Sequence, residues 1–254
     1  MRRFAAILFR RLGVSLPLCL VATGSLLLIP GCQSTQSKSA ELAEQGAEMI
    51  DPGTVQIGNE NVQVEVLESV LLTDEYGAAV AVTLKNNSDR FLANLPILID
   101  VRDKRGKSIF RNDQVGTAPA LLGYPLVGPG ETVTWVHDQI LASGAPASVK
   151  VKVGSKVDAP PAGEPPKIVV SDIKLQVDPV SGVEVVGDAE NLSPLDQQEL
   201  TFFAVSRKGG EIVAAGRGGL KKLSGGQKTD FASFFIGDPQ GGDVSVEAPP
   251  TTLN

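Results

Sequence analysis

The stretch Asn61-Val62-Gln63-Val64-Glu65-Val66-Leu67 places a valine at every second position. Successive side chains of a strand point to opposite faces of a sheet, so this period of two predicts a β-strand. The same alternation, separated by turn-forming residues, recurs at 78–85, 95–101, 131–140 and 148–153. Several short strands at this spacing predict an all-β fold of the sandwich type.

A proline-rich segment, Asp-Ala-Pro-Pro-Ala-Gly-Glu-Pro-Pro, occupies residues 158–166. Such a segment is stiff and cannot join the interior of a sheet, so we expect it to be a linker. It separates a first predicted β-sandwich domain at 60–157 from a second at 167–254. The alternation resumes in the second domain at 168–176, 183–189, 199–206, 211–214, 229–236 and 244–247.

The two predicted domains match each other in sequence. At an offset of 104 residues, Asn87 aligns with Asn191 and Ile99 aligns with Phe203. Farther on, Trp135 aligns with Phe231 at an offset of 96, so the second copy has eight fewer residues between these blocks. This match predicts a tandem duplication.

Both copies carry the same order of local features: a polar Asn at a strand end, an alternating strand, a Gly-containing turn and a later Gly-rich turn. The first copy has Asp103-Lys-Arg-Gly106-Lys107 and Pro129-Gly-Glu-Thr132, and the second has Arg207-Lys-Gly-Gly210-Glu211. This pattern resembles the FxLYD-type domains, although Arg102 and Ser206 stand at the Tyr position of that family. The resemblance implies tandem immunoglobulin-like sandwiches that act as interaction modules of bacterial envelopes and catalyse no reaction.

The N-terminal segment resembles a lipoprotein signal peptide. Residues 1–11 contain four arginines and no acidic residue. Residues 12–29 are mostly apolar and are interrupted by Pro17. Ile29-Pro30-Gly31-Cys32 then fits a lipoprotein cleavage site, which predicts a signal peptide at 1–31 and lipidation of Cys32. The alternative is an uncleaved transmembrane helix at 12–29, whose length is near the lower limit for spanning.

Lipidation would anchor the protein in a bilayer at the cell envelope, on the outer face of the plasma membrane or in the outer membrane. Residues 32–59 begin with a polar run and are predicted to be a tether, with a possible short helix at 40–50. Without the four leader arginines, 19 basic and 29 acidic residues remain, a net charge of about −10. This charge argues against nucleic acid as a partner.

Cysteine usage excludes two further kinds of structure. Cys19 lies in the leader and Cys32 is the lipid acceptor, so the rest of the chain has no cysteine. The folded body therefore has no disulfide and no thiolate metal site.

The sequence contains no pattern typical of an active site. His137 is the only histidine and is predicted to lie on the surface or on an edge strand. The glycines at 218–226 lack the Gly-Lys pair and following helix of a phosphate-binding loop, and are predicted to form a turn before a strand. Asp100, Asp103 and Asp113 lack EF-hand spacing, and Asp103 is expected to order a turn. We therefore expect no enzyme activity, cofactor or bound metal.

A partner contact is predicted at an apolar segment that the second copy lacks and at one of two consecutive phenylalanines. The residues are Leu121, Leu122, Tyr124, Leu126 and Phe203. The alternatives are a loop folded over the first sandwich for the segment, and a covered edge or domain interface for Phe203. Trp135, Phe231 and Phe202 are expected in the core.

These observations favour a noncatalytic, membrane-anchored envelope lipoprotein that presents two β-sandwich domains to a protein or cell-wall partner. The alternative is a lipoprotein that captures a solute or a metal and is associated with a transporter.

Overall fold

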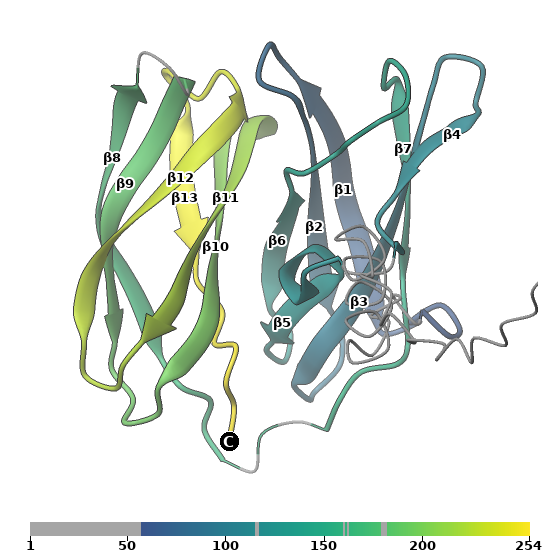
Figure 1. The fold of residues 1–254 in the computed structure, drawn as a ribbon. Helices are drawn as coiled ribbons and strands as arrows, with labels where there is room; N and C mark the ends of the chain where they lie inside the picture. The colour runs from purple at the N-terminus through teal and green to yellow at the C-terminus, as the bar shows by residue number, and fades with distance from the viewer. Residues whose placement is uncertain (1–56, 115–116, 160, 162, 179–181) are drawn as a thin grey trace, which may run out of the picture. The chain divides into compact units, whose positions relative to one another are not determined.

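The computed structural model describes residues 57–114, 117–159, 161, 163–178 and 182–254. In these residues thirteen antiparallel strands form three sheets, and the fold is all-β as predicted (Figure 1). All of the described residues belong to one compact unit. The predicted signal peptide, the lipidated Cys32 and the possible helix at 40–50 lie outside the described residues.

The first half of the fold, residues 60–157, contains two sheets. One has the order β1-β2-β6, made of β1 (Val64–Thr73), β2 (Ala78–Asn86) and β6 (Thr132–His137). The other is centred on β3 (Leu92–Arg102), which pairs with β7 (Ser148–Val153) along one edge. Its opposite edge pairs with β4 (Ser108–Arg111) and β5 (Gly123–Val127).

Strand β1 starts three residues later than the alternation at Asn61 suggests. The side-chain oxygen of Asn61 accepts a hydrogen bond from the Gln63 amide, and its carbonyl accepts one from the Val64 amide. These bonds form a turn, because an Asn side chain competes locally with strand pairing. Val62 is consequently 96% exposed.

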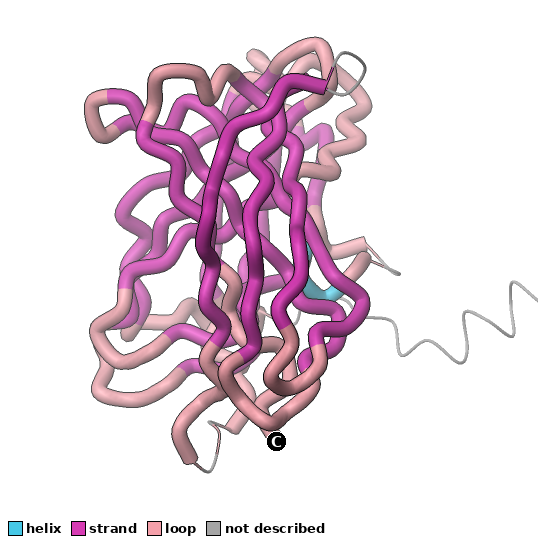
Figure 2. The backbone as a smooth tube through the Cα atoms, turned by 90° about the vertical axis from the view of Figure 1, so that its left-hand side faces the viewer, coloured by secondary structure: helices cyan, strands magenta, loops and turns pink. Residues whose placement is uncertain are grey.

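The second half, residues 167–254, forms one six-stranded sheet in the order β13-β10-β11-β12-β9-β8. Its edge strands β13 and β8 contact each other, so the sheet is nearly closed (Figures 1 and 2). The strands are β8 (Ile168–Asp178), β9 (Gly182–Asn191), β10 (Gln197–Lys208), β11 (Glu211–Leu223), β12 (Lys228–Gly237) and β13 (Asp243–Glu247).

A buried asparagine fixes the end of the second strand in each half. In the first half, Nδ2 of Asn86 donates to the carbonyls of Arg90 and Gly128 at 2.8 and 2.9 Å. Its Oδ1 accepts hydrogen bonds from the amide and hydroxyl of Ser88. The amide side chain therefore ties its own turn to a distant one.

Asn191 makes the same set of bonds in the second half. Its Nδ2 donates to the carbonyls of Leu195 and Leu223, and its Oδ1 accepts from the amide and hydroxyl of Ser193. Both asparagine side chains are fully buried, and all their polar atoms are bonded. The two Asn-x-Ser segments therefore form the same type of turn at the end of a strand.

This correspondence corrects the alignment of the two halves by one residue. Asn86, rather than Asn87, is the equivalent of Asn191, so the offset in this region is 105. Arg102 and Arg207 correspond at the same offset, since each follows a register shift in its strand. Each also donates from Nη1 to the carbonyl of the glycine in the next turn. The shorter turn after Arg207 then reduces the offset to 104.

The eight additional residues of the first half lie between β4 and β5 and include the 3-10 helix η1 (Pro119–Leu121). Where the second half has one continuous strand, β11, the insertion leaves the backbone of Ile97 and Ile99 without a strand partner on that edge. The buried Asn112 side chain takes the place of this missing partner, because it accepts a hydrogen bond from the Ile99 amide and donates one to the Ile97 carbonyl. The insertion is thus part of the first half's core structure.

The insertion also explains a difference between the equivalent aromatic residues of the two cores. Trp135 donates its indole N–H to the carbonyl of Ala120 in η1, at 2.9 Å. The second half has no insertion, and it has Phe231 at this position, which needs no acceptor. Trp135 and Phe231 are buried, as predicted.

The two consecutive phenylalanines of β10 serve different cores. Phe202 stacks on Phe231 at 4.4 Å between ring centroids, within the core of the second half. Phe203 points to the other face and joins the core of the first half, together with Val205 and Ile212. Phe203 therefore lies at the interface between the two halves, which is the alternative that the sequence left open for this residue.

Candidate functional site

Tyr124 connects the two halves. Its ring stacks on Phe203 at 5.2 Å, and its hydroxyl donates to Oε2 of Glu247 at 2.7 Å. The Glu247 carboxylate also accepts from the amide of Thr134, on the edge strand β6. Burial, followed by the negative charge of Glu247, raises the pKa of Tyr124 well above its ordinary value.

Arg207 makes a second polar connection. Its Nη1 donates to Glu68 at 2.8 Å and to the carbonyl of Gly210, and its Nη2 donates to Thr83 at 3.0 Å. Both terminal nitrogens of this guanidinium are therefore bonded within the chain. In addition, the amide of Gly237 in the second half donates to the side chain of Asp74 in the first half.

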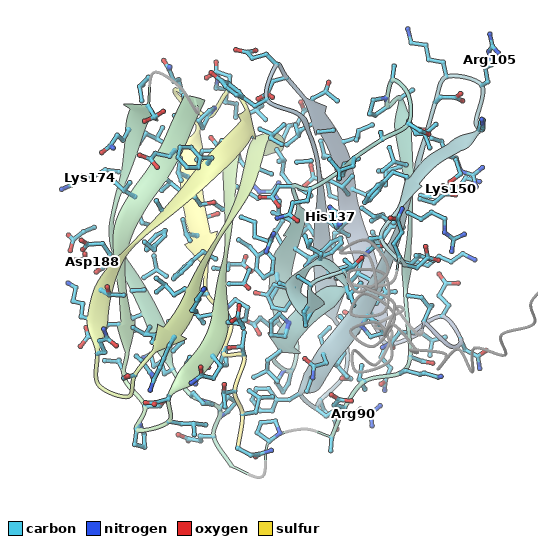
Figure 3. All side chains as sticks on the ribbon, in the orientation of Figure 1. Arg90, Arg105, His137, Lys150, Lys174 and Asp188 are labelled. Carbon is cyan, nitrogen blue, oxygen red and sulfur yellow. The ribbon has the colours of Figure 1, made fainter. Side chains whose placement is uncertain are left out.

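Arg217 and Asp138 form a third connection, beside the histidine. Nε of Arg217 donates to Oδ1 of Asp138 at 3.1 Å, and both side chains are largely buried. His137, which is labelled in Figure 3, is 1% exposed. Its ring makes edge contacts with the rings of Phe110 and Trp135. This residue belongs to the edge strand β6, but the prediction of a surface position is wrong because aromatic residues cover it.

Burial and the nearby positive charge of Arg217 lower the pKa of His137 to about 3. Among the described residues, neither ring nitrogen has a hydrogen-bond partner. His137 is therefore a neutral core residue near pH 7, and no carboxylate polarises it as a general base would require.

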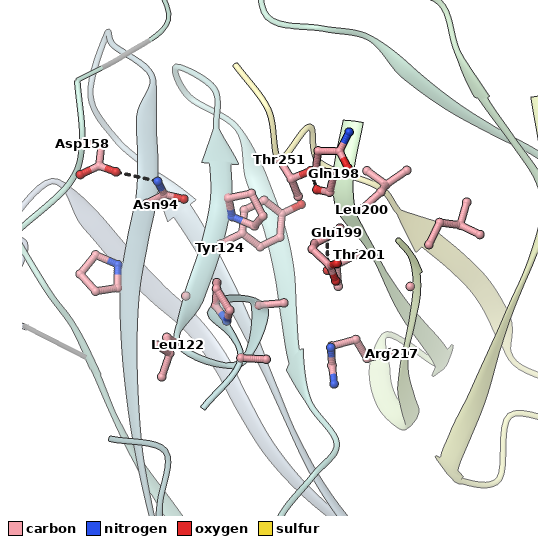
Figure 4. A pocket seen from close by; sticks show the side chains of 18 of the residues that line it. Asn94, Leu122, Tyr124, Asp158, Gln198, Glu199, Leu200, Thr201, Arg217 and Thr251 are labelled. Carbon is pink, nitrogen blue, oxygen red and sulfur yellow. Dashed lines mark hydrogen bonds between the residues drawn. The ribbon is translucent and has the colours of Figure 1, made fainter. Parts of the chain in front are cut away.

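A cavity of about 850 Å³ lies next to Tyr124 (Figure 4). One wall consists of η1 and the first residues of β5, and the other consists of β10 and β11 around Thr201 and Gly219. The size is typical of small-molecule sites. Both halves of the fold are needed to form it.

Small residues keep the cavity open. Ala118, Ala120 and Gly123 line the first wall, and Gly219 lies on the opposite wall. The nearest atom to a Cβ built on Gly219 would be the carbonyl oxygen of Leu200 at 3.4 Å, so a side chain fits there. The cavity therefore depends on the absence of side-chain volume.

Two residues with unusual backbone geometry also line the cavity. Asn94 and Glu199 have φ values of 48° and 50°, and they are equivalent at the offset of 105. This left-handed region is disfavoured for Glu in particular, and such residues often cluster at functional sites. Nδ2 of Asn94 donates to Asp158 at 2.6 Å.

The residues predicted to contact a partner are mostly covered. Leu121, Tyr124, Leu126 and Phe203 are buried within the chain, and Leu122 is partly exposed. Leu122 and Tyr124 line the cavity, whereas the other three do not. The structure thus brings two of the five to the candidate site.

Sequence reasoning missed Arg217 and Glu199, which also line the cavity. Of the glycines at 218–226, Gly225 and Gly226 form the turn before β12, as predicted, and no helix follows in this described segment. Gly218 and Gly219 lie within β11, so the prediction of a turn is wrong for them.

The described residues contain no group of three or more His, Cys, Asp or Glu side chains that could hold a metal ion. Asp100 and Asp113 are paired with Arg102 and Arg111, respectively. Asp103 accepts from the amides two and four residues later, which confirms its role in ordering a turn. None of the helices in the described residues has the length and apolarity to span a membrane.

Comparison of the chain with models of known families finds no match, and no curated protein matches it significantly. The resemblance to FxLYD-type domains remains a prediction.

Proposed function

We propose that the protein is a noncatalytic envelope lipoprotein, anchored through Cys32, that presents two tandem immunoglobulin-like β-sandwich domains for interaction with a protein or cell-wall partner. The observation that carries this proposal is the cavity next to Tyr124, because residues from both halves line it. Ligand pockets occur preferentially at interfaces between domains.

The immunoglobulin-like assignment is supported by the repeated local structure. Asn86 and Asn191 have matching hydrogen bonds, and both halves place an aromatic residue at the position of Trp135 in the core. In the described residues all the strands are antiparallel, and aromatic residues lie in both cores, as is typical of sandwiches.

The second candidate function is capture of a solute for a transporter. The volume of the cavity favours it, since about 850 Å³ suits a small molecule rather than a large protein surface. The described residues offer no cluster of metal ligands, so the structure supports the solute version of this alternative rather than the metal version.

The anchor is tested by expressing the full chain and its Cys32→Ala variant in bacteria. We expect acylation and membrane association for the wild type, and release of the folded variant from the membrane when it is processed. Retention of the unacylated variant in the membrane fraction, with residues 12–29 still attached, would support the transmembrane alternative.

The binding site is tested by placing a photo-crosslinking amino acid at Leu122, which lines the cavity, and separately at Leu141, which is 89% exposed elsewhere. A protein-sized adduct at position 122 alone supports a protein partner, and an adduct of small-molecule mass supports solute capture. Equal labelling at both positions, or none at 122, contradicts a binding role for the cavity.

A further inference from the structure

The guanidinium of Arg217 has donors that the fold does not use. Its Nε is bonded to Asp138, but among the described residues no acceptor bonds to Nη1 or Nη2. Arg207 provides the contrast, because both of its terminal nitrogens are bonded. Arg217 lines the cavity and extends from β11 toward the wall of the first half (Figure 4).

The lining of the cavity carries charges of both signs. Three cationic side chains, Lys156, Arg217 and Lys221, line the cavity with two anionic ones, Asp158 and Glu199. The guanidinium of Arg217 is also paired with Asp138, but only through Nε. A carboxylate at Nη1 and Nη2 would therefore share this guanidinium with Asp138.

The remaining surface of the cavity is suited to an apolar group. Pro96, Pro119, Leu122 and Leu220 line it together with the small residues described above. A carboxylate fits the planar fork of an arginine through two parallel hydrogen bonds, and an attached hydrocarbon group would cover the apolar walls.

We propose that this cavity binds a carboxylate that carries an apolar group, with Arg217 as the carboxylate-binding residue. The inference rests on the proposed function, in which the cavity is a binding site. The carboxylate can belong to a free monocarboxylic acid or to the C-terminus of a peptide that ends in an apolar residue. These two sources correspond to solute capture and to a protein partner, respectively.

The structure supplies a built-in reporter of binding. Trp135 is the only tryptophan, and its indole is bonded to Ala120, a residue that lines the cavity. A ligand in the cavity is expected to change its fluorescence. Titrations would use the full chain in lipid nanodiscs with 4-methylpentanoate, its amide, and acetyl-Ala-Leu as the free acid and as the C-terminal amide.

We expect 4-methylpentanoate or the acetyl-Ala-Leu acid to bind, and the matching amide to bind at least about tenfold more weakly, because hydrogen bonds to a charged group are the stronger kind. Binding of 4-methylpentanoate alone indicates a free acid, and binding of the peptide acid alone indicates a peptide C-terminus. Equal binding of acid and amide, or binding of neither acid, overturns the proposal.

Variants test the role of Arg217 in the same titration. Arg217→Gln should weaken binding of the acid about 10- to 100-fold. Asp138→Asn is the matched control, because it removes the same ion pair but leaves the guanidinium, and it should bind the acid at least as well as the wild type. Arg217→Lys keeps the charge beside Asp138 and provides a second variant if the Gln variant does not fold. Wild-type affinity in both Arg217 variants contradicts the assignment.

Position 219 tests the cavity itself. Gly219→Leu should abolish binding, since the added side chain occupies the space between the walls. Gly163→Leu is the control, because a Cβ there has no atom within 4 Å and the residue does not line the cavity. If the wild type binds neither acid but still gives the crosslink at position 122, this inference fails while the proposed function stands.

Discussion

The hydroxyl of Tyr124 donates a 2.7 Å hydrogen bond to the carboxylate of Glu247, across 123 residues of sequence. The bond joins β5 of the first half to the last strand of the second. The same carboxylate accepts from the amide of Thr134, which lies on an edge strand and would otherwise have no partner from its own sheet. One side chain therefore satisfies donors from two strands of the other half.

Tyr124→Phe removes the hydroxyl and keeps the ring that stacks on Phe203. The variant should lose about 1.5–3 kcal/mol of unfolding free energy, because the bond is made to a charged acceptor. Urea unfolding measures the loss. Tyr76→Phe is the matched control, since Tyr76 is 51% exposed, and its effect should stay within about 0.5 kcal/mol. Equal effects of the two changes would contradict a structural role for the Tyr124 hydroxyl.

Glu247→Gln tests the ionisation of the carboxyl group. Burial raises the pKa of Glu247 above its ordinary value of 4.5, the charge of Glu131 adds to this, and the bonds from Tyr124 and Thr134 oppose it. A raised pKa means that the folded protein holds the proton more tightly than the unfolded chain does. Its contribution to stability is therefore complete below pH 4.5 and is lost as the pH rises through the folded-state pKa.

The Gln variant has no such ionisation. Its unfolding free energy should therefore increase relative to that of the wild type as the pH is raised from 4 to 7 in urea titrations. A difference that is constant over this range, or that changes in the opposite direction, would show that the Glu247 pKa is not raised by folding.

The two buried asparagines give a matched prediction about the duplication. Asn86→Ala and Asn191→Ala each leave two carbonyls and a serine without their partner, and each should destabilise the protein by at least about 2 kcal/mol. Asn87→Ala should cost less than about 0.5 kcal/mol, because that side chain is exposed and makes only one bond of 3.3 Å. A large loss at Asn87 with a small one at Asn86 would support the offset of 104 instead of 105.

The period of two was sufficient to predict most strands, because β-branched residues alternate in them. It missed the four-residue strand β4, which is too short to show alternation. It also failed at β5, where Gly123 and Pro125 are poor strand formers, and at the second half of β11, where Gly216 and Gly218 interrupt the pattern. Those two glycines are required by a distant contact, since a Cβ on either would overlap a carbonyl oxygen of β12. Local propensity carries no information about such an approach.

The candidate site was less predictable than the fold. Arg217 stands among glycines and reads as part of a turn, and its side chain is bonded to Asp138, which is distant in sequence. Tyr124 was predicted to contact a partner, and the sequence alone does not show that its ring is covered by Phe203. The ungapped alignment was wrong by one residue in this region, since matching hydrogen bonds make Asn86 the equivalent of Asn191.

His137 provides a prediction of opposite sign to that for Glu247. The pKa of His137 is lowered by burial, and then by Arg217, from 6.5 to about 3. The unfolded chain thus binds a proton more readily than the folded protein. The contribution of this group to stability is present above pH 6.5 and is lost as the pH falls from there toward 3.

At pH 5 the loss from His137 should amount to about 2 kcal/mol, since each pH unit below the unfolded pKa contributes about 1.4 kcal/mol. His137→Leu cannot be protonated, and its ring-free side chain suits a site where neither nitrogen is bonded. The wild type should therefore lose about 2 kcal/mol more than the variant between pH 7 and pH 5, measured by urea unfolding. Parallel pH profiles would mean that the imidazole is protonated as easily in the folded protein as in the unfolded chain, which its contacts with Phe110 and Trp135 argue against.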